Sequence, residues 1–304
     1  MTNEEPEHQA RAAAFAFLDS VSRQLGGIVR FEDVARFEFR GEKMSLLDPQ
    51  RGIRKPRQLS AALSVRTVYA VDPSSRPYED EIGDDGYLRY KWRGIDGEHS
   101  ENRALREALN QRLPLIWFQG VAAGVYVPIY PVWLVAEERS EHQFVVALDE
   151  RQLQSWERDS PTTVAELALR YGQRLVKERM HQPVFRARVL VAYQGQCALC
   201  LLRHMELLDA AHIRADAEGG LPVVPNGIAM CKIHHAAFDV HIIGIRPDHV
   251  IQVRKDVLVE PDGPTLRHAI QALHNERIVV PIKRTARPDP QLLDERFESF
   301  LRAG

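Results

Sequence analysis

The chain has 304 residues, of which 44% are hydrophobic and 27% are charged, and its formal net charge is −2. This composition is typical of a globular protein and excludes a chain that is disordered throughout. No apolar run reaches the ~20 residues that span a bilayer, and the acidic N-terminus is not that of a secretory signal. Three cysteines cannot form a disulfide framework, so we expect a cytoplasmic protein that does not enter a membrane.

The N-terminal half of the chain has the pattern of a mixed α+β domain. Residues 4–25 carry apolar side chains at helical spacing and are expected to form a helix. Short strands separated by turn signals are expected between 26 and 95, followed by a helix at 99–112 and then three longer strands. We therefore predict that residues 1–150 form one domain, built on a curved β-sheet or barrel.

A helical connector is expected next. Pro161 opens a helix that runs to about Met180, and Pro183 is expected to interrupt it before a second helix at 184–194. We interpret 151–183 as a linker.

The linker runs into a basic segment, 168–190, in which cations outnumber acids. Such a segment can form a face that holds a phosphate backbone even when the whole chain is nearly neutral. The side chains expected to contact DNA there are Arg174, Lys177, Arg186 and Arg188. The remainder, 184–304, is predicted to be a second domain that ends in an amphipathic helix.

Two pairs of soft ligands stand in this second domain. Cys197 and Cys200 are separated by two residues, and so are Cys231 and His234. Tetrahedral Zn²⁺ accepts such a Cys₃His set, and a closed site with four protein ligands is structural rather than catalytic. No cysteine is left over, which favours a zinc site over three buried free thiols at a chance spacing.

Four polar residues close to the zinc pairs remain unexplained by them. His235 and Asp239 are four residues apart on the helix expected after Cys231, so they share one face. A histidine and a carboxylate with open positions suit Mg²⁺, Mn²⁺ or a similar cation. His212 ends a strand-like apolar stretch, and the loop that follows it ends at Asn226.

This layout resembles the HNH (ββα-metal) nuclease family over roughly residues 185–245. The resemblance rests on AAHI at 210–213, on NGIAM followed by C-x-x-HH at 226–235, and on FD at 238–239. It implies a zinc-supported ββα-metal domain that hydrolyses phosphodiesters with one metal ion. In that family the residues in these positions have defined roles. The resemblance therefore implies that His212 is the general base, that Asn226 orders the loop and orients the histidine, and that His235 and Asp239 bind the metal.

The sequence departs from the family at one position. Many members place a metal-binding Asp or His directly before the base, where this chain has Ala211. Asp209, two residues back on the same strand face, could take that place. Two simpler interpretations stay open: His212 could be a core histidine, and the domain could be an inactive HNH fold that only binds.

The stretch GYLRYKWRGID at 86–96 offers a candidate nucleic-acid surface in the first domain. Aromatic rings suit bases and interleaved cations suit phosphates, although a strand with its aromatics in the core and its cations in water would have the same pattern. With its neighbours, this stretch resembles the SRA-like (PUA-related) domains that are fused to HNH nucleases. Such domains extrude a modified cytosine from the duplex.

The SRA-like resemblance implies a pocket of aromatic rings with a polar residue that reads the base edge. Asp96 is the preferred carboxylate for the cytosine amino group, with Asp84 and Asp85 as alternatives. The pocket candidates are Tyr87, Tyr90, Trp92, Asp96 and Trp117.

Together the two resemblances predict a modification-dependent endonuclease. It would bind double-stranded DNA that carries 5-methylcytosine or 5-hydroxymethylcytosine, with Zn²⁺ in a structural site and Mg²⁺ or Mn²⁺ in the catalytic one. Because one HNH site cleaves one strand and a double-strand break requires two sites, we expect a homodimer or transient pairing on DNA. The alternatives are an HNH nuclease that reads ordinary sequence or another modification such as phosphorothioate, and a non-catalytic zinc-knuckle DNA-binding protein.

Overall fold

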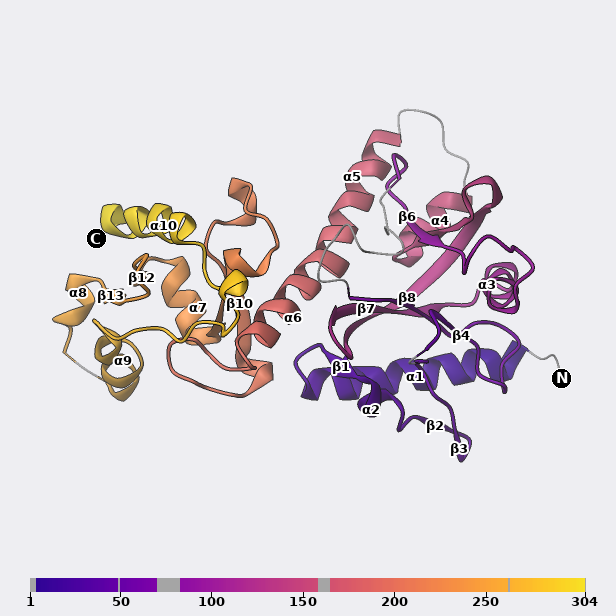
Figure 1. The fold of residues 1–304 in the computed structure, drawn as a ribbon, viewed down its shortest axis with the longest axis horizontal. Coiled ribbons are helices and arrows are strands. Elements are labelled where there is room, and N and C mark those ends of the chain that lie inside the picture. Colours follow the sequence, from indigo (N-terminus) through magenta and orange to yellow (C-terminus); the bar gives the residue numbers. More distant parts are fainter. Residues whose placement is uncertain (1–3, 49, 70–82, 158–164, 262, 304) are drawn as a thin grey trace. The chain divides into compact units, whose positions relative to one another are not determined.

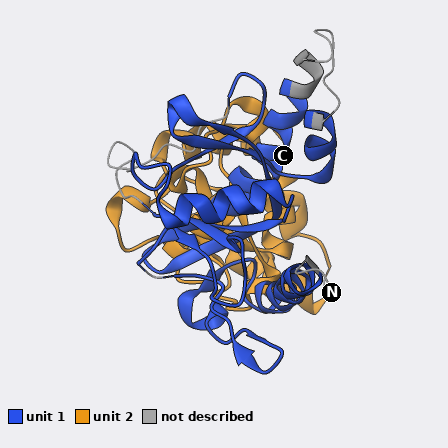
Figure 2. Cartoon of the chain, turned by 90° about the vertical axis from the view of Figure 1, so that its right-hand side faces the viewer, with its two compact units in different colours: residues 1–184 blue, residues 185–304 orange. Residues whose placement is uncertain are grey.

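The computed structural model describes residues 4–48, 50–69, 83–157, 165–261 and 263–303. The chain forms two compact units, residues 1–184 (unit 1) and residues 185–304 (unit 2), shown in Figures 1 and 2. Within the described ranges, no helix has the length and apolar character needed to cross a membrane.

A seven-stranded sheet forms the centre of unit 1, in the order β4-β5-β7-β8-β9-β6 with β1 paired to β8. The path ends at β4 and β6, so the sheet curls into a half-barrel rather than closing (Figure 1). The three strands expected before residue 150 are β7, β8 and β9. The strands are β1 (Val29–Arg30), β4 (Ile53–Arg54), β5 (Ser64–Thr67), β6 (Leu88–Lys91), β7 (Leu115–Ala122), β8 (Val125–Glu138) and β9 (Gln143–Ala147), and a separate small hairpin consists of β2 (Glu38–Phe39) and β3 (Glu42–Lys43).

Helix α1 (Glu4–Gln24) covers one face of this sheet (Figure 1). Ala10, Ala14 and Leu18 recur every four residues and are fully buried, in the same core cluster as Ile116 and Phe118 of β7. Burial of a large apolar side chain contributes roughly 1.5–3 kcal/mol. The other helices of unit 1 are α2 (Phe31–Val34), α3 (Ser100–Asn110), α4 (Glu150–Glu157) and α5 (Ala165–Val176).

The helices expected to form a separate linker belong to unit 1. The hydroxyl of Tyr87 donates a hydrogen bond to the carbonyl of Gln152 in α4 at 2.9 Å. The guanidinium of Arg179 donates to the carbonyls of Tyr130 (2.6 Å) and Pro131 (3.2 Å) in β8. Side chains of the segment 151–183 are therefore used to hold it on the sheet.

The helix break expected at Pro183 is wrong. Helix α5, a π-helical turn (Lys177–His181) and α6 (Gln182–Ala192) follow one another without interruption. The N–H of Gln182 bonds to the carbonyl of Lys177, five residues back. The wider π turn makes room before a proline ring that cannot donate a hydrogen bond, so the helix continues.

Helix α5 approaches the turn before β6 so closely that only glycine fits at residue 172. A Cβ atom on Gly172 would lie 2.1 Å from the carbonyl oxygen of Gly86. Gly172→Ala is therefore expected to destabilise unit 1 by about 1–3 kcal/mol, because the backbones must move apart. If α5 did not contact Gly86, Gly172→Ala would stabilise the helix by about 1 kcal/mol. The direction in which the midpoint of thermal denaturation shifts therefore tests this contact. The exposed neighbour Gln173→Ala is the control and should leave the midpoint unchanged.

Unit 2 is built around a ββα element. Strands β10 (Leu208–His212) and β11 (Gly227–Cys231) form an antiparallel hairpin, and α7 (Lys232–Asp239) begins directly after β11. Around this element lie β12 (Ile243–Ile245), β13 (Ile251–Val253), α8 (Lys255–Leu258), α9 (Pro264–Ala269) and α10 (Pro290–Ala303).

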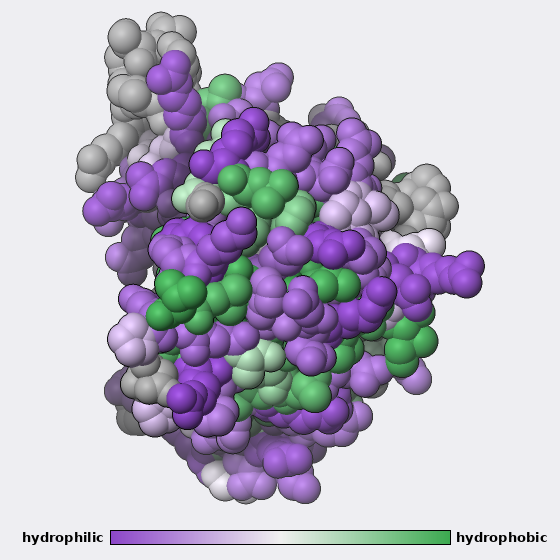
Figure 3. Space-filling model, turned by 90° about the vertical axis from the view of Figure 1, so that its left-hand side faces the viewer, coloured by the Kyte–Doolittle hydropathy of each residue, from purple (hydrophilic) through white to green (hydrophobic). Residues whose placement is uncertain are grey.

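One continuous core holds unit 2 together. It includes Leu208, Ile228 and Phe238 of the ββα element and Leu293 of α10. The face of the molecule in Figure 3 is mostly hydrophilic, and its apolar side chains form small separate patches.

Candidate active site

The β10–β11 hairpin carries a different cluster at each end. At one end Leu208 pairs with Cys231, and at the other His212 pairs with Gly227. Helix α7 begins directly after Cys231 and lies against β10, so side chains of α7 lie beside the hairpin. One short ββα element thus positions the predicted catalytic residues and two of the predicted zinc ligands, Cys231 and His234, whereas Cys197 and Cys200 lie in the loop after α6.

The structure brings the four predicted zinc ligands together. Their ligand atoms all lie within 4.8 Å of one another. Sγ of Cys200 is 4.0 Å from Sγ of Cys231, and Nδ1 of His234 is 3.1 Å from Sγ of Cys231 and 3.4 Å from Sγ of Cys197. Tetrahedral zinc–sulfur bonds of ~2.3 Å would separate neighbouring sulfurs by ~3.8 Å. The cluster fits Zn²⁺, and no second group of three or more such ligands occurs within the ranges that the structure describes.

The three thiols affect each other's protonation. A hydrogen bond between Cys197 and Cys231 lowers the pKa of Cys197 and, together with burial, raises the pKa of Cys231 to about 11. Burial raises the pKa of Cys200. Because zinc binds thiolates, zinc binding would release protons from these thiols.

A contact from outside the motif orients the zinc histidine. Nε2 of His234 lies 2.7 Å from the carbonyl oxygen of Ala269, at the end of α9. A histidine that donates one ring N–H to a carbonyl presents its other nitrogen to a metal. The position of Ala269 fixes Nδ1 as the ligand atom, in agreement with its distances to the sulfurs.

His235 lies between two carboxylates. Its Nε2 is 3.3 Å from Oδ2 of Asp239, and its Nδ1 is 3.4 Å from Oδ2 of Asp209. Two atoms bound at ~2.1 Å and at right angles to one Mg²⁺-like ion lie ~3.0 Å apart. Nε2 of His235 and Oδ2 of Asp239 thus fit a shared cation, and Asp239 is 54% exposed and open to solvent.

Asp209 is held by two cations. Both of its carboxylate oxygens accept hydrogen bonds from Nζ of Lys232 at 2.7 Å, and Nε of Arg186 is 3.6 Å from Oδ1. Burial raises the pKa of Asp209, but the hydrogen bond and charge of Lys232, with those of His235, outweigh it and hold the pKa below its usual value. The carboxylate is therefore ionised at neutral pH.

The ring of His212 stacks on Phe185. Their centroids are 4.1 Å apart and the planes are inclined by 22°. Gly227 leaves space for the ring of Phe185, because a Cβ atom on residue 227 would lie 2.8 Å from Cζ of Phe185 and 2.5 Å from Cγ2 of Val189. A residue of α6 thus restricts the orientation of the predicted general base.

Asn226 secures the backbone beyond His212. Its Oδ1 accepts a hydrogen bond from the N–H of Arg214 (2.8 Å), and its Nδ2 donates to the carbonyls of Arg214 (3.1 Å) and Leu221 (3.0 Å). The side chain is buried. Its amide satisfies three backbone groups of the loop and so fixes where β10 ends.

Helix α10 contributes to the same region. The guanidinium of Arg296 lies 4.8 Å from the centroid of the Phe238 ring, donates to the Phe238 carbonyl at 3.0 Å, and is 3.8 Å from Oδ1 of Asp239. The positive charge of Arg296 therefore lies near Oδ1 of Asp239, the oxygen that does not face His235.

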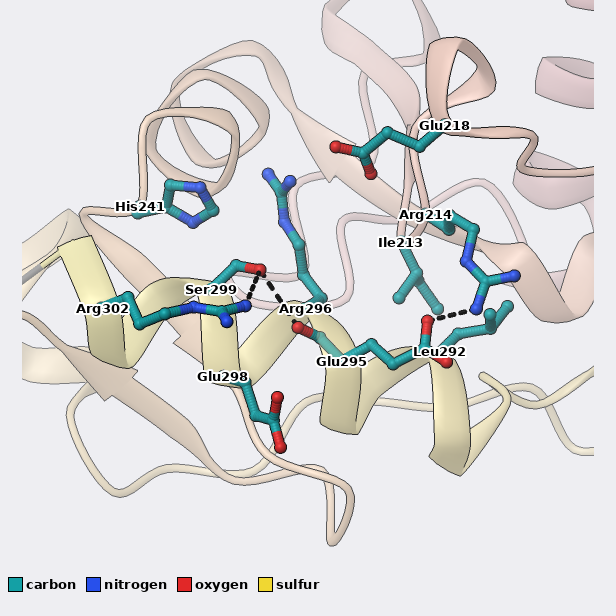
Figure 4. A pocket seen from close by; sticks show the side chains of 10 residues that line it. All are labelled: Ile213, Arg214, Glu218, His241, Leu292, Glu295, Arg296, Glu298, Ser299 and Arg302. Carbon is teal, nitrogen blue, oxygen red and sulfur yellow. Dashed lines mark hydrogen bonds and ion pairs between the residues drawn. The ribbon is translucent and has the colours of Figure 1, made fainter.

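A cavity of about 300 Å³ lies between α10 and the loop after β10, and Figure 4 shows the side chains that line it. Arg214 points toward Glu295 and pairs with it (Figure 4). The charged lining consists of three arginines and three glutamates, so the charges balance: Arg214, Arg296, Arg302, Glu218, Glu295 and Glu298.

The predicted base-pocket residues of unit 1 do not form one group. Tyr90 and Trp117 are buried in edge-to-face contact with centroids 5.5 Å apart, whereas Tyr87 packs against Trp156 and Trp92 against His142. The side chain of Asp96 is exposed and caps a turn by accepting the N–H of Glu98 at 2.9 Å.

Several predicted DNA-contacting cations have partners inside the chain. Arg186 donates to the carbonyls of Met205 (3.0 Å) and Leu208 (2.6 Å), and so braces β10 instead of facing solvent. Arg174 pairs with Glu178 at 2.7 Å but is exposed, as is Lys177, and Arg188 is half-buried. On β6, Arg89 is held by Asp85 and Glu138.

Gln119 is a residue that sequence reasoning missed. It lies on the face of β7 that also carries Trp117, opposite Ile116 and Phe118. The side chain is 8% exposed, and no donor within the described part of the chain reaches its Oε1. A lone polar residue in an apolar strand was the only signal for it.

The comparisons with known proteins bear on unit 2. Residues 197–246 match the HNH_2 family, described as HNH endonuclease. No curated protein matches the chain. Among the solved structures that are similar to the chain, two share 15% identity with it. One is described as "Modification dependent TagI restriction endonuclease" (81% of this chain, 84% of that chain, TM-score 0.28). The other is the Type IV phosphorothioation-dependent restriction endonuclease ScoMcrA (62% of this chain, 48% of that chain, TM-score 0.25).

TM-scores of 0.28 and 0.25 are too low to support an inference about this chain. The assignment of an activity therefore rests on the family match and on the geometry of the site. The matched segment includes both zinc-ligand pairs and the whole ββα element, with His212 at the end of β10 and His235 on α7. The protein is therefore an endonuclease with an HNH domain in unit 2.

Proposed function

We propose that the protein is a modification-dependent DNA endonuclease. The observation that carries the nuclease part is the ββα element, which places His212, Asn226 and the His235–Asp239 pair in one short hairpin and helix. His212 accepts the proton of the attacking water, whose oxygen forms a bond to phosphorus as the bond to the leaving sugar oxygen breaks.

Each of the other residues supports that step. Phe185 restricts the imidazole of His212, and Asn226 fixes the end of its strand. His235 and Asp239 would hold a divalent cation such as Mg²⁺ or Mn²⁺, which supplies positive charge beside the phosphate and the leaving oxygen. The Cys₃His cluster would hold Zn²⁺ and has no open position for chemistry.

For the substrate we propose double-stranded DNA with 5-methylcytosine or 5-hydroxymethylcytosine, flipped into unit 1. Tyr90 and Trp117 remain pocket candidates because their rings meet, and the free Oε1 of Gln119 could accept the cytosine amino group in place of Asp96. Arg174 and Lys177 are exposed and remain candidates for the DNA backbone. We further propose that two copies act together, because one HNH site cuts one strand.

A second candidate is an HNH nuclease that reads ordinary sequence or phosphorothioate. It is favoured by the position of Asp96, which caps an exposed turn instead of joining the buried rings of Tyr90 and Trp117.

The test is cleavage of one plasmid prepared unmodified, with 5-methylcytosine, with 5-hydroxymethylcytosine and with phosphorothioate, in Mg²⁺ and in Mn²⁺. Cutting confined to the two modified-cytosine plasmids is expected. Cutting confined to phosphorothioate DNA, or equal cutting of all four, would keep the nuclease and reject the cytosine reader. Gln119→Ala and Asp96→Ala, compared on the same plasmids, show which side chain reads the base.

A further inference from the structure

We propose that Asp209 is a positioning residue for the metal site, fixing the tautomer of His235 so that its Nε2 is free to bind the cation. This inference rests on the proposed role of His235 and Asp239. It assigns a function to Asp209, whose carboxylate touches His235 from outside α7, at Nδ1 and at 3.4 Å.

A neutral imidazole carries one proton, on Nδ1 or on Nε2, and only the unprotonated nitrogen can bind a metal. In this site Nδ1 faces Asp209, and Nε2 faces Oδ2 of Asp239 at 3.3 Å. An ionised carboxylate only accepts hydrogen bonds, so Asp209 favours the proton on Nδ1. Asp239 would favour the proton on Nε2 by the same rule, but not when its oxygen and Nε2 share a cation. The lone pair of Nε2 is then directed to the side where Asp239 lies.

The contacts of Asp209 argue against its being a metal ligand. Both of its oxygens already accept from the Lys232 ammonium at 2.7 Å, and Arg186 lies 3.6 Å from Oδ1. The two nitrogens of an imidazole point in divergent directions, so a group at Nδ1 and an ion at Nε2 lie on different sides of the ring. Asp209 therefore does not replace the ligand that is absent at Ala211.

The surroundings of Asp209 keep it in place. It stands on β10, and Arg186, which approaches its carboxylate, is itself tied to the backbone carbonyls of Met205 and Leu208. Lys232, at the start of α7, links the same carboxylate to the helix that carries His235. Carboxylates that orient metal-binding histidines in this way typically change metal affinity about 10–100-fold when removed.

The first test is the tautomer of His235, read from nitrogen chemical shifts of the zinc-loaded full-length protein at pH 8 without Mg²⁺ or Mn²⁺. It is made in the Asp239→Ala variant, because the Asp239 carboxylate, 3.3 Å from Nε2, would otherwise compete for the ring proton. Asp239→Ala is expected to carry the proton on Nδ1, and adding Asp209→Ala is expected to move it to Nε2. A proton on Nε2 in Asp239→Ala, or one that stays on Nδ1 when Asp209→Ala is added, would overturn the inference.

The second test is Mn²⁺ affinity, measured from the paramagnetic resonance of free Mn²⁺. Asp209→Ala is expected to bind about 10–100-fold more weakly, and Asp256→Ala, which removes an exposed carboxylate from the same unit, should bind like the wild type. Asp209→Asn combined with Lys232→Met keeps an acceptor oxygen beside Nδ1 without a competing ammonium. It should bind within about three-fold of Lys232→Met alone.

If Asp209→Asn combined with Lys232→Met lost as much Mn²⁺ affinity as Asp209→Ala, Asp209 would be a metal ligand. That result would contradict its positioning role. His235→Ala separates this result from failure of the proposed function. If Mn²⁺ affinity is the same in His235→Ala as in the wild type, the metal site itself is wrong, whatever Asp209 does.

Discussion

His212→Ala is expected to lower the rate of DNA cleavage by about 10²–10⁴-fold, which is the usual contribution of a positioned general base. His212 is the last residue of β10 and its ring stacks on Phe185, whereas the predicted metal-binding pair lies on α7 and the zinc cluster lies at the other end of the hairpin. The variant should therefore fold, retain zinc and bind DNA like the wild type. Single-turnover cleavage and a binding titration on the same DNA measure the two effects separately.

The matched control for this variant is His204→Ala. His204 lies in the same unit and is exposed, and its Nδ1 is 3.6 Å from a carboxylate oxygen of Glu206. Its removal should leave cleavage unchanged. Phe185→Leu keeps an apolar side chain but removes the stacking surface, so it should reduce the cleavage rate without changing Mn²⁺ affinity. Wild-type cleavage by His212→Ala would remove His212 from the role of base and direct attention to His241, which lines the adjacent cavity.

The sequence predicted the parts of unit 2 that depend on local geometry. A four-residue spacing on a helix was enough to place His235 beside Asp239, and two-residue gaps were enough to pair the zinc ligands. The pattern of apolar residues also located β7, β8 and β9, without showing which strands pair.

Contacts made by residues far apart in the chain could not be predicted in this way. His234 meets the carbonyl of Ala269 across 35 positions, and His235 meets Asp209 across 26. Such contacts depend on how α7 and α9 pack, and an alanine carbonyl carries no sequence signal at all. The part of the site that orients the ligands therefore becomes visible only in the folded chain.

In unit 1 Tyr90 and Trp92 are buried, as in the alternative interpretation of a strand with its aromatics in the core. Alternation does not distinguish that arrangement from a base-binding one, nor a cation that faces DNA from one that faces a carboxylate. Arg89 meets Glu138 because β6 and β8 flank β9, a neighbour relation that no local pattern contains. Asp96 lies in an exposed turn after β6, where its carboxylate accepts a hydrogen bond from a backbone N–H.

Removal of zinc is expected to unfold unit 2 and to leave unit 1 folded. The cluster joins the loop at Cys197 and Cys200 to the start of α7, and His234 extends the connection to α9 through Ala269. Structural zinc sites in small domains contribute apparent binding energies of about 10–16 kcal/mol, as large as the whole stability of an ordinary domain, which is about 5–15 kcal/mol. The two units have separate cores, so circular dichroism with a strong chelator should show loss of part of the helical signal, and proteolysis should spare unit 1.

Zinc stoichiometry and rescue distinguish the structural ion from the catalytic one. One zinc per chain is expected, and Cys231→Ser should lose both the zinc and the fold of unit 2, because Cys231 joins β11 to α7. Since the thiols must be ionised to bind, less chelator should suffice as the pH falls. Because the zinc ligand His234 and the catalytic residue His235 are adjacent on α7, the chelated protein cannot regain cleavage from Mg²⁺ alone, but it should regain it when zinc is restored before Mg²⁺. Full activity of chelated protein in Mg²⁺ would mean that the ββα element holds its shape without zinc.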